Sequence, residues 1–280
     1  MIENTVEYIR TQLSKSYTPG EIRVFVRLIL KEVCNLSFSD IFACKFNDLS
    51  DKEKQNIISI VKRLQNGEPI QYVLGETEFY GLDFKVTPAV LIPRPETEEL
   101  VEWILLETKK MNAHILDVGT GSGCIAVALA KRMRYATVNA WDVSADALAV
   151  AKGNATANDV SVSFSKVDVL GPHPVNKYFD IIVSNPPYIK ESEKEMMEKN
   201  VLDFEPHMAL FVADKDVLIF YNRIADIAKE QLKENGLLYF EINQANGNEV
   251  VQLLKEKNFV DVEMKKDISG NDRMVRAMKV

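Results

Sequence analysis

The chain carries two kinds of hydrophobic pattern, one before and one after about residue 75. In residues 1–75, apolar positions recur every three or four residues, as on the buried face of a helix. Two such stripes are Ile22, Val26, Leu28, Ile29 and Val33, and Ile57, Ile58, Ile60, Val61 and Leu64. This spacing predicts a small N-terminal helical bundle over 1–75.

Two capping boxes mark where helices of this bundle begin. Segments 18–21 (Thr-Pro-Gly-Glu) and 50–53 (Ser-Asp-Lys-Glu) each place a hydroxyl at the N-cap and a glutamate three residues later. Pro19 stands at the first helical position, where its missing N–H is not needed. We therefore expect helices to begin directly after Thr18 and Ser50.

From residue 76 onward, short apolar runs alternate with turns and helical segments. Residues 76–92 alternate around Tyr80-Gly81, which predicts a β-hairpin, and we assign 76–93 to a linker. Strands are expected near residues 113, 136, 160, 180, 236, 259 and 273, with the last two joined as an antiparallel edge hairpin. This alternation predicts an α/β domain over 94–280 whose ligands bind at the carboxyl ends of the strands.

The tetrapeptide Asn185-Pro186-Pro187-Tyr188 directly follows the apolar run 179–184. Because prolines lock φ, it marks a stiff turn at the end of a buried strand. The Asn185 side-chain oxygen and the Pro186 carbonyl both accept hydrogen bonds, and Tyr188 adds an aromatic face. The group suits a planar nitrogen with two N–H donors, either a carboxamide or an exocyclic base amine. A plain strand-ending turn is the alternative interpretation.

A glycine-rich loop, 119–123 (Gly-Thr-Gly-Ser-Gly), follows another predicted strand, and its glycines permit positive φ and close approach of a ligand. The loop lacks the Gly-Lys-Ser/Thr ending of a P-loop and the Gly-x-Gly-x-x-Gly spacing of a dinucleotide site. Asp142 ends the next strand, 23 residues beyond Gly119, where an acid would meet a ribose diol. Asp168 ends a third strand, placed to accept from an adenine amine. Together the three strand ends predict a site for a ligand with a ribose and a base.

This order of motifs resembles the class I S-adenosylmethionine-dependent methyltransferases, and within them those that use Asn-Pro-Pro-Tyr to methylate a planar nitrogen. Four further segments resemble the PrmC/HemK family: 67–75 (Gly-Glu-Pro-Ile-Gln-Tyr-Val-Leu-Gly), 79–82 (Phe-Tyr-Gly-Leu), 90–98 (Val-Leu-Ile-Pro-Arg-Pro-Glu-Thr-Glu) and 204–206 (Phe-Glu-Pro). The tetrapeptide is shared with DNA adenine and some ribosomal RNA methyltransferases, whereas 92–98 and the N-terminal region are more specific. Two local departures are Asn243, where the family usually has glycine, and 215–218, where it often has a Gly-Leu pair.

The resemblance implies a Rossmann-like seven-stranded sheet and S-adenosylmethionine as cofactor, with S-adenosylhomocysteine as product. It also implies methylation of the glutamine amide nitrogen, N5, in the Gly-Gly-Gln motif of class I peptide chain release factors, with the bundle docking the protein substrate. Two alternatives remain. One is an N6-adenine or other amino methyltransferase acting on DNA or ribosomal RNA, and the other is a binding module without catalysis.

Site residues follow from the same resemblance. Catalysis is assigned to Asn185, Pro186 and Tyr188, and substrate binding to these three together with Pro187. Cofactor binding is assigned to Asp117, Gly119, Thr120, Gly121, Ser122, Gly123, Asp142, Asp168, Val169, Asn185 and Arg94. Asp117 is expected either to position the loop or to meet the cofactor's ammonium through water. Glu205 and Glu241 are expected to order loops, and His207 to lie in one.

Charge disfavours nucleic acid as the substrate. The net charge is −7, and residues 1–75 hold 10 basic and 9 acidic side chains, which leaves 24 against 32 for the rest. A protein that wraps duplex DNA generally clusters Lys and Arg. The densest cluster here, 131–134, follows a predicted helix, where basic residues suit the helix C-terminus.

The sequence also indicates the cellular compartment, the state of the cysteines and whether the protein holds a metal. The chain has no run of about 18 apolar residues, and its start lacks a basic and apolar leader, so we expect a cytoplasmic protein with no membrane contact. A monomer is expected separately. Cys34, Cys44 and Cys124 are expected to be reduced core thiols. The three histidines form no metal pattern, and we predict no metal.

Overall fold

The computed structural model describes residues 5–36, 49–175 and 178–280, and the chain divides into two compact units. The helical unit comprises 1–75 and 198–204, and the sheet unit comprises 76–197 and 205–280. The predicted linker, 76–93, thus falls within the sheet unit, whereas 198–204 fall within the helical one. Cys44 lies outside the described residues.

The helical unit contains α1 (Thr5–Leu13), α2 (Pro19–Cys34), α4 (Asp51–Gln65), α5 (Ile70–Leu74) and α9 (Lys199–Phe204). Both predicted capping boxes are present. The Thr18 N–H donates to Glu21 at 2.8 Å, and the Ser50 N–H donates to Glu53 at 2.7 Å. Most of the predicted stripe residues lie in the buried core, namely Ile22, Val26, Ile29, Ile57, Ile60, Val61 and Leu64. The core also contains Ile9, Leu13, Leu30, Ile70 and Val73, whereas Leu28, Val33 and Ile58 of the stripes are only partly buried.

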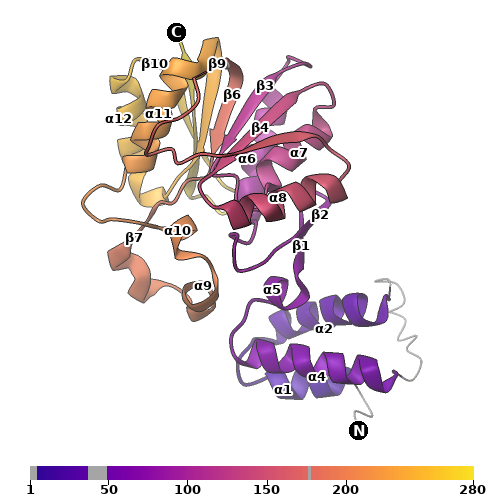
Figure 1. The fold of residues 1–280 in the computed structure, drawn as a ribbon. Helices are drawn as coiled ribbons and strands as arrows, with labels where there is room; N and C mark the ends of the chain where they lie inside the picture. Colours follow the sequence, from indigo (N-terminus) through magenta and orange to yellow (C-terminus); the bar gives the residue numbers. More distant parts are fainter. Residues whose placement is uncertain (1–4, 37–48, 176–177) are drawn as a thin grey trace. The chain divides into compact units, whose positions relative to one another are not determined.

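Within the described residues, the sheet unit is built on a seven-stranded sheet of order β10-β11-β9-β6-β3-β4-β5 (Figure 1). Its strands are β3 (His114–Val118), β4 (Thr137–Asp142), β5 (Val162–Lys166), β6 (Phe179–Ser184), β9 (Leu232–Glu241), β10 (Phe259–Lys266) and β11 (Asp272–Lys279). All seven predicted strands are confirmed. Only β11 runs antiparallel to the others, because it forms the predicted edge hairpin with β10.

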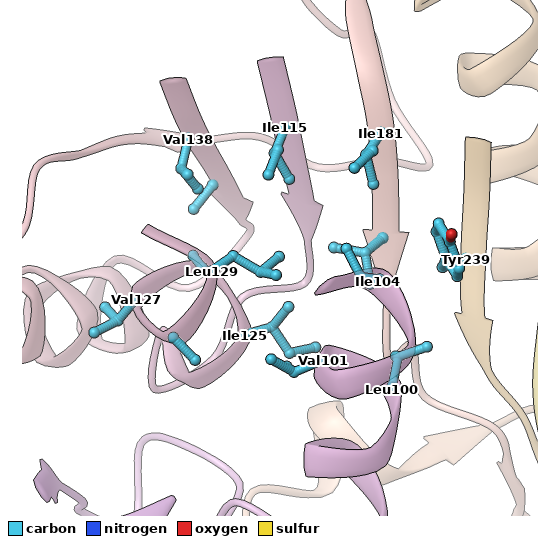
Figure 2. Packing of buried hydrophobic residues seen from close by; sticks show 14 of the residues in the cluster. Leu100, Val101, Ile104, Ile115, Ile125, Val127, Leu129, Val138, Ile181 and Tyr239 are labelled. Carbon is cyan, nitrogen blue, oxygen red and sulfur yellow. The ribbon is translucent and has the colours of Figure 1, made fainter. Parts of the chain in front are cut away.

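Helices cover both faces of this sheet. On one face lie α11 (Ile219–Gln231) and α12 (Gly247–Glu256), and on the other lie α6 (Pro95–Glu107), α7 (Cys124–Arg132) and α8 (Ala145–Ala157) (Figure 1). Figure 2 shows side chains of α6 and α7 packed on the strands, with Ile104 beside Ile181 and Leu129 beside Ile115. Strands buried on both faces need apolar side chains on both, which is why β6 reads as a nearly continuous apolar run.

Shorter elements complete the sheet unit. The hairpin of β1 (Glu76–Phe79) and β2 (Leu82–Lys85) turns at Tyr80 and Gly81, with φ of 52° and 71°, as in the tight hairpin turns that match strand twist. The others are β7 (Ile189–Lys190), η1 (Glu191–Met196), α10 (His207–Leu210), β8 (Phe211–Val212) and η2 (Gln244–Asn246). The hairpin prediction is confirmed for 76–85. Residues 86–92, which the prediction included, do not form strand. In the part of the chain that the structure describes, no helix is long and apolar enough to span a membrane.

Candidate active site at the strand carboxyl ends

A cavity of about 290 Å³ opens where β3, β4, β5 and β6 end. This is just below the usual range for small-molecule sites, about 300–1,000 Å³. Most of the predicted site residues line it: Arg94, Gly119, Thr120, Gly121, Ser122, Asp142, Asp168, Val169, Asn185, Pro186 and Pro187. Asp117, Gly123 and Tyr188 are not in its wall. Parallel strands bring these segments together because their carboxyl ends meet at one edge of the sheet.

The glycine loop takes the backbone conformation that its sequence predicts. Gly119, Gly121 and Gly123 have φ of 74°, 54° and 82°. Open space surrounds the Cβ positions of the first two, whereas a Cβ on Gly123 would lie 3.0 Å from the Cβ of Ala151 in α8. The first two glycines therefore leave room at the cavity wall, and the third lets α8 approach the loop.

Asp117 lies beneath the loop. Its side chain is fully buried, and its Oδ2 accepts a 2.6 Å hydrogen bond from the Thr120 hydroxyl. Burial raises the pKa of the Asp117 carboxyl to about 7, although the bond from Thr120 opposes the shift. Of the two roles predicted for Asp117, this geometry favours positioning the loop.

Asp142 and Asp168 present carboxylates to the cavity from adjacent strand ends. Asp142 accepts from the Gly121 N–H at 2.8 Å and from the Ser144 N–H at 2.9 Å. Asp168 accepts from the Leu170 N–H at 2.9 Å. Each carboxylate oxygen offers a further lone pair, so both acids can still accept hydrogen bonds from a ligand.

The cavity also has apolar lining residues that the sequence pattern did not single out. Met208, Phe220 and Ile224 line it together with the predicted Val169. Phe220 and Ile224 lie four residues apart on α11, a spacing that in sequence is indistinguishable from ordinary core packing. A cavity lined by the Asp168 carboxylate and by apolar side chains suits a flat base that carries an amine.

The tetrapeptide leaves β6 and enters the cavity wall at Asn185, Pro186 and Pro187. The Asn185 Nδ2 donates to the Thr97 hydroxyl at 3.3 Å, and that hydroxyl donates to Oε2 of Glu241 at 2.6 Å. Thr97 and Glu241 are each 2% exposed. Sequence reasoning assigned no role to Thr97, because a threonine in the first turn of a helix carries no chemical signature.

Tyr188 faces Glu241. Its hydroxyl donates to Oε1 of Glu241 at 3.3 Å. Burial raises the pKa of Tyr188, and it also raises the pKa of Glu241, against the opposing effects of the Thr97 bond and the Arg273 charge. The expected stacking of the Tyr188 ring on an acceptor stays a prediction.

Arg94 also lines the cavity and pairs with Glu205. Its Nη2 lies 2.5 Å from Oε1 of Glu205, whose carboxylate is almost fully buried and also accepts from the Ile92 N–H at 3.3 Å. This pair joins the segment before α6 to the segment before α10, which agrees with the loop-ordering role expected of Glu205. His207 packs edge-on to the Phe211 ring, with 5.2 Å between the ring centroids. Among residues 5–36, 49–175 and 178–280, no group of three or more His, Cys, Asp or Glu is arranged to hold a metal ion.

The seven-stranded sheet and the cavity at its strand ends define an α/β methyltransferase domain, and comparison with known proteins agrees. The Methyltransferase small domain family matches residues 97–204, and the PrmC N-terminal domain family matches residues 5–75. The chain belongs to the release factor glutamine methyltransferase family.

Similar proteins span nearly the whole chain. A release factor glutamine methyltransferase of Flavobacterium psychrophilum is 47% identical over 279 residues, covering 97% of this chain and 98% of the relative. That of Bacteroides thetaiotaomicron is 46% identical over 271 residues, covering 96% and 97%. A solved methyltransferase from Pyrococcus furiosus shares the fold, with a TM-score of 0.54 at 16% identity over 82% of this chain and 99% of that one.

Proposed function

We propose that this protein transfers a methyl group from S-adenosylmethionine to the side-chain amide nitrogen, N5, of the glutamine in the Gly-Gly-Gln motif of class I peptide chain release factors. The observation that carries the proposal is that Asn185 and Pro186 line the same cavity as the glycine loop and Asp142. Membership of the release factor glutamine methyltransferase family supports the substrate. We propose further that 1–75 dock the release factor, that 76–93 act as linker, that 94–280 carry the chemistry, and that the protein works as a monomer in the cytoplasm.

The residues around the cavity fit this cofactor part by part. The backbone of 119–123 would lie along it, Asp142 would accept from the ribose hydroxyls, and Asp168 with Val169 would meet the adenine. Arg94 would lie at the methionine end. When bound, the cofactor supplies a methyl group already activated by its attachment to a sulfonium.

The acceptor nitrogen needs help from the protein. The lone pair of a carboxamide nitrogen is delocalised into its carbonyl, so it is a poor nucleophile. If the Asn185 Oδ1 and the Pro186 carbonyl each accept one N–H, they fix the plane of the amide and stabilise positive charge that develops on the nitrogen during attack. Holding the nitrogen in line with the methyl group contributes up to about 7–11 kcal/mol in well-oriented systems. The methylated nitrogen is positively charged and loses its proton readily, so no strong base is needed.

The test offers the purified protein labelled S-adenosylmethionine together with one of four acceptors. These are a class I release factor, its variant with Gly-Gly-Glu in the motif, duplex DNA and ribosomal RNA. We expect label only on the unaltered factor. Label on nucleic acid would favour the amino methyltransferase alternative, and label on the Gly-Gly-Glu variant would exclude the motif glutamine as the acceptor.

The same assay tests the role of Asn185. We expect Asn185→Ala to lower turnover by roughly 100-fold or more, the size of effect seen when one preorganised polar contact to a transition state is lost. Calorimetry should find cofactor binding largely retained. Asn248→Ala, at an exposed position of α12, is the control. Equal loss of cofactor binding and turnover would mean that Asn185 mainly builds the pocket.

A further inference from the structure

We propose that Thr97 and Glu241 are positioning residues that hold the Asn185 amide in a single orientation, with its oxygen available to the methyl acceptor. The inference deepens the proposed function and rests on it for the identity of the acceptor. Thr97 lies in the first turn of α6, Glu241 ends β9 and Asn185 follows β6, so three separate elements supply the chain of bonds.

The chain of hydrogen bonds starts at the buried carboxylate of Glu241. Each of its oxygens faces a hydroxyl, Thr97 at 2.6 Å on Oε2 and Tyr188 at 3.3 Å on Oε1. The Thr97 hydroxyl is the donor in the 2.6 Å bond and Oε2 of Glu241 is the acceptor. The Thr97 proton is therefore directed at Glu241.

The Thr97 bond to Glu241 fixes the direction of the hydrogen bond between Thr97 and Asn185. A hydroxyl has one proton, and Thr97 donates it to Glu241, so the Thr97 oxygen can only accept from Asn185. The Asn185 Nδ2 lies 3.3 Å from this oxygen. The oxygen and nitrogen ends of an amide have nearly the same shape, and the bonds around them decide which end points where. Here the Thr97 oxygen selects the nitrogen end.

The flipped amide would place Oδ1 of Asn185 against Oγ1 of Thr97, two acceptors facing each other where Thr97 is 2% exposed. Leaving a buried polar atom without its partner disfavours that orientation on the order of ten- to a hundredfold. A flipped amide would also turn its N–H groups toward the N–H groups of the acceptor. The Thr97 hydroxyl thus excludes the orientation that cannot accept the substrate amide.

Glu241 acts on both ends of the tetrapeptide. It reaches Asn185 through Thr97, and it binds the Tyr188 hydroxyl directly. One buried carboxylate therefore sets the hydrogen-bond direction at the first and the last residue of the turn.

The test removes the hydroxyl without changing the shape of the side chain. We expect Thr97→Val to lower kcat with the release factor roughly ten- to a hundredfold, while KM and the Kd of S-adenosylhomocysteine stay within about twofold. Thr97→Ser, which keeps the hydroxyl, should recover most of the lost turnover. Thr137→Val, at an exposed strand position, is the matched control. Unchanged kcat in Thr97→Val, or the same loss in Thr97→Ser, would overturn the proposal. If Thr97→Val does not fold, Thr97→Ala is read in the same way.

A second measurement does not depend on the substrate. In ¹⁵N-labelled protein, the side-chain amide signal of Asn185 is identified by its absence from Asn185→Ala. We expect its hydrogen exchange to be slow in the wild type, faster in Thr97→Val and restored in Thr97→Ser. Equal exchange in the wild type and Thr97→Val would overturn the inference whatever the activity. Faster exchange in Thr97→Val, combined with no methylation of any release factor by the wild type, would support the positioning and overturn the proposed function.

Discussion

The backbone N–H of Gly121 donates a 2.8 Å hydrogen bond to Oδ2 of Asp142, which joins the glycine loop after β3 to the end of β4. The Ser144 N–H holds the other carboxylate oxygen at 2.9 Å. Two backbone donors therefore hold the Asp142 carboxylate in place at the cavity wall. Because the carboxylate is already ordered, ligand binding does not cost the conformational entropy of ordering it.

Asp142 is predicted to matter for cofactor affinity. Asp142→Ala removes both the proposed acceptor for the ribose hydroxyls and the hydrogen bond to Gly121, and a hydrogen bond to a charged group contributes about 1.5–3 kcal/mol. We expect the Kd for S-adenosylhomocysteine to rise about tenfold or more, measured by calorimetry. Asp83→Ala, an exposed position of β2, controls for loss of charge. An unchanged Kd would remove Asp142 from the predicted cofactor site.

Two glycine substitutions are predicted to have opposite effects on stability. Gly123→Ala forces a side chain into positive φ and toward Ala151, so we expect the free energy of unfolding to fall by about 1–3 kcal/mol. Gly153→Ala, within α8 and with no atom within 4 Å of its Cβ position, should raise it by about 0.5–1 kcal/mol. Urea unfolding of both variants measures the difference. Equal effects would mean that the third loop glycine is not required by packing.

The raised pKa of Asp117 predicts a pH dependence of stability. In the unfolded chain the carboxyl titrates near its ordinary value, whereas in the folded protein it holds its proton to about pH 7. The folded state therefore binds more protons between about pH 4 and 7, and the contribution of Asp117 to stability is lost as pH rises through that window.

Comparison with Asp117→Asn, which does not titrate, isolates this contribution. We expect the stability of the wild type relative to the variant to decline on the order of 1 kcal/mol per pH unit between about pH 4 and 7, and to level off above. Unfolding curves at several pH values check the slope, with Asp83→Asn as the control. A flat difference would show that the Asp117 carboxyl ionises normally in the folded protein.

The Arg94–Glu205 pair predicts non-additive effects. Arg94→Met leaves the buried Glu205 carboxylate without its cation. Since the Arg94 side chain is 35% exposed, we expect a loss of about 1–3 kcal/mol, less than for a fully buried pair. Adding Glu205→Gln removes the buried charge, so the double variant should be more stable than Arg94→Met alone. Thermal unfolding measures the stability of the wild type, Arg94→Met, Glu205→Gln and the double variant, which together form a double-mutant cycle. If the losses of the two single variants simply add in the double variant, Arg94 and Glu205 are not coupled.

Local patterns predicted much of the fold. Alternation of apolar runs located the seven strands, capping boxes located the starts of α2 and α4, and the glycine spacing located the loop with positive φ. These predictions are correct because each feature depends on residues within a few positions of one another, so its physical cause is already present in the sequence. The hairpin is shorter than predicted: β2 ends at Lys85, and segment 86–92 is not strand.

The sequence by itself determined the elements, the loop, the tetrapeptide and, through resemblance, the family. Tertiary structure alone decided how the tetrapeptide is held. Asn185 meets Thr97 across 88 residues, and Thr97 meets Glu241 across 144. It also decided that Asp117 lies beneath the loop and that Phe220 and Ile224 face the cavity. The reason is physical: local spacing sets which way a backbone runs, whereas the partner of a buried polar atom depends on which distant elements pack beside it.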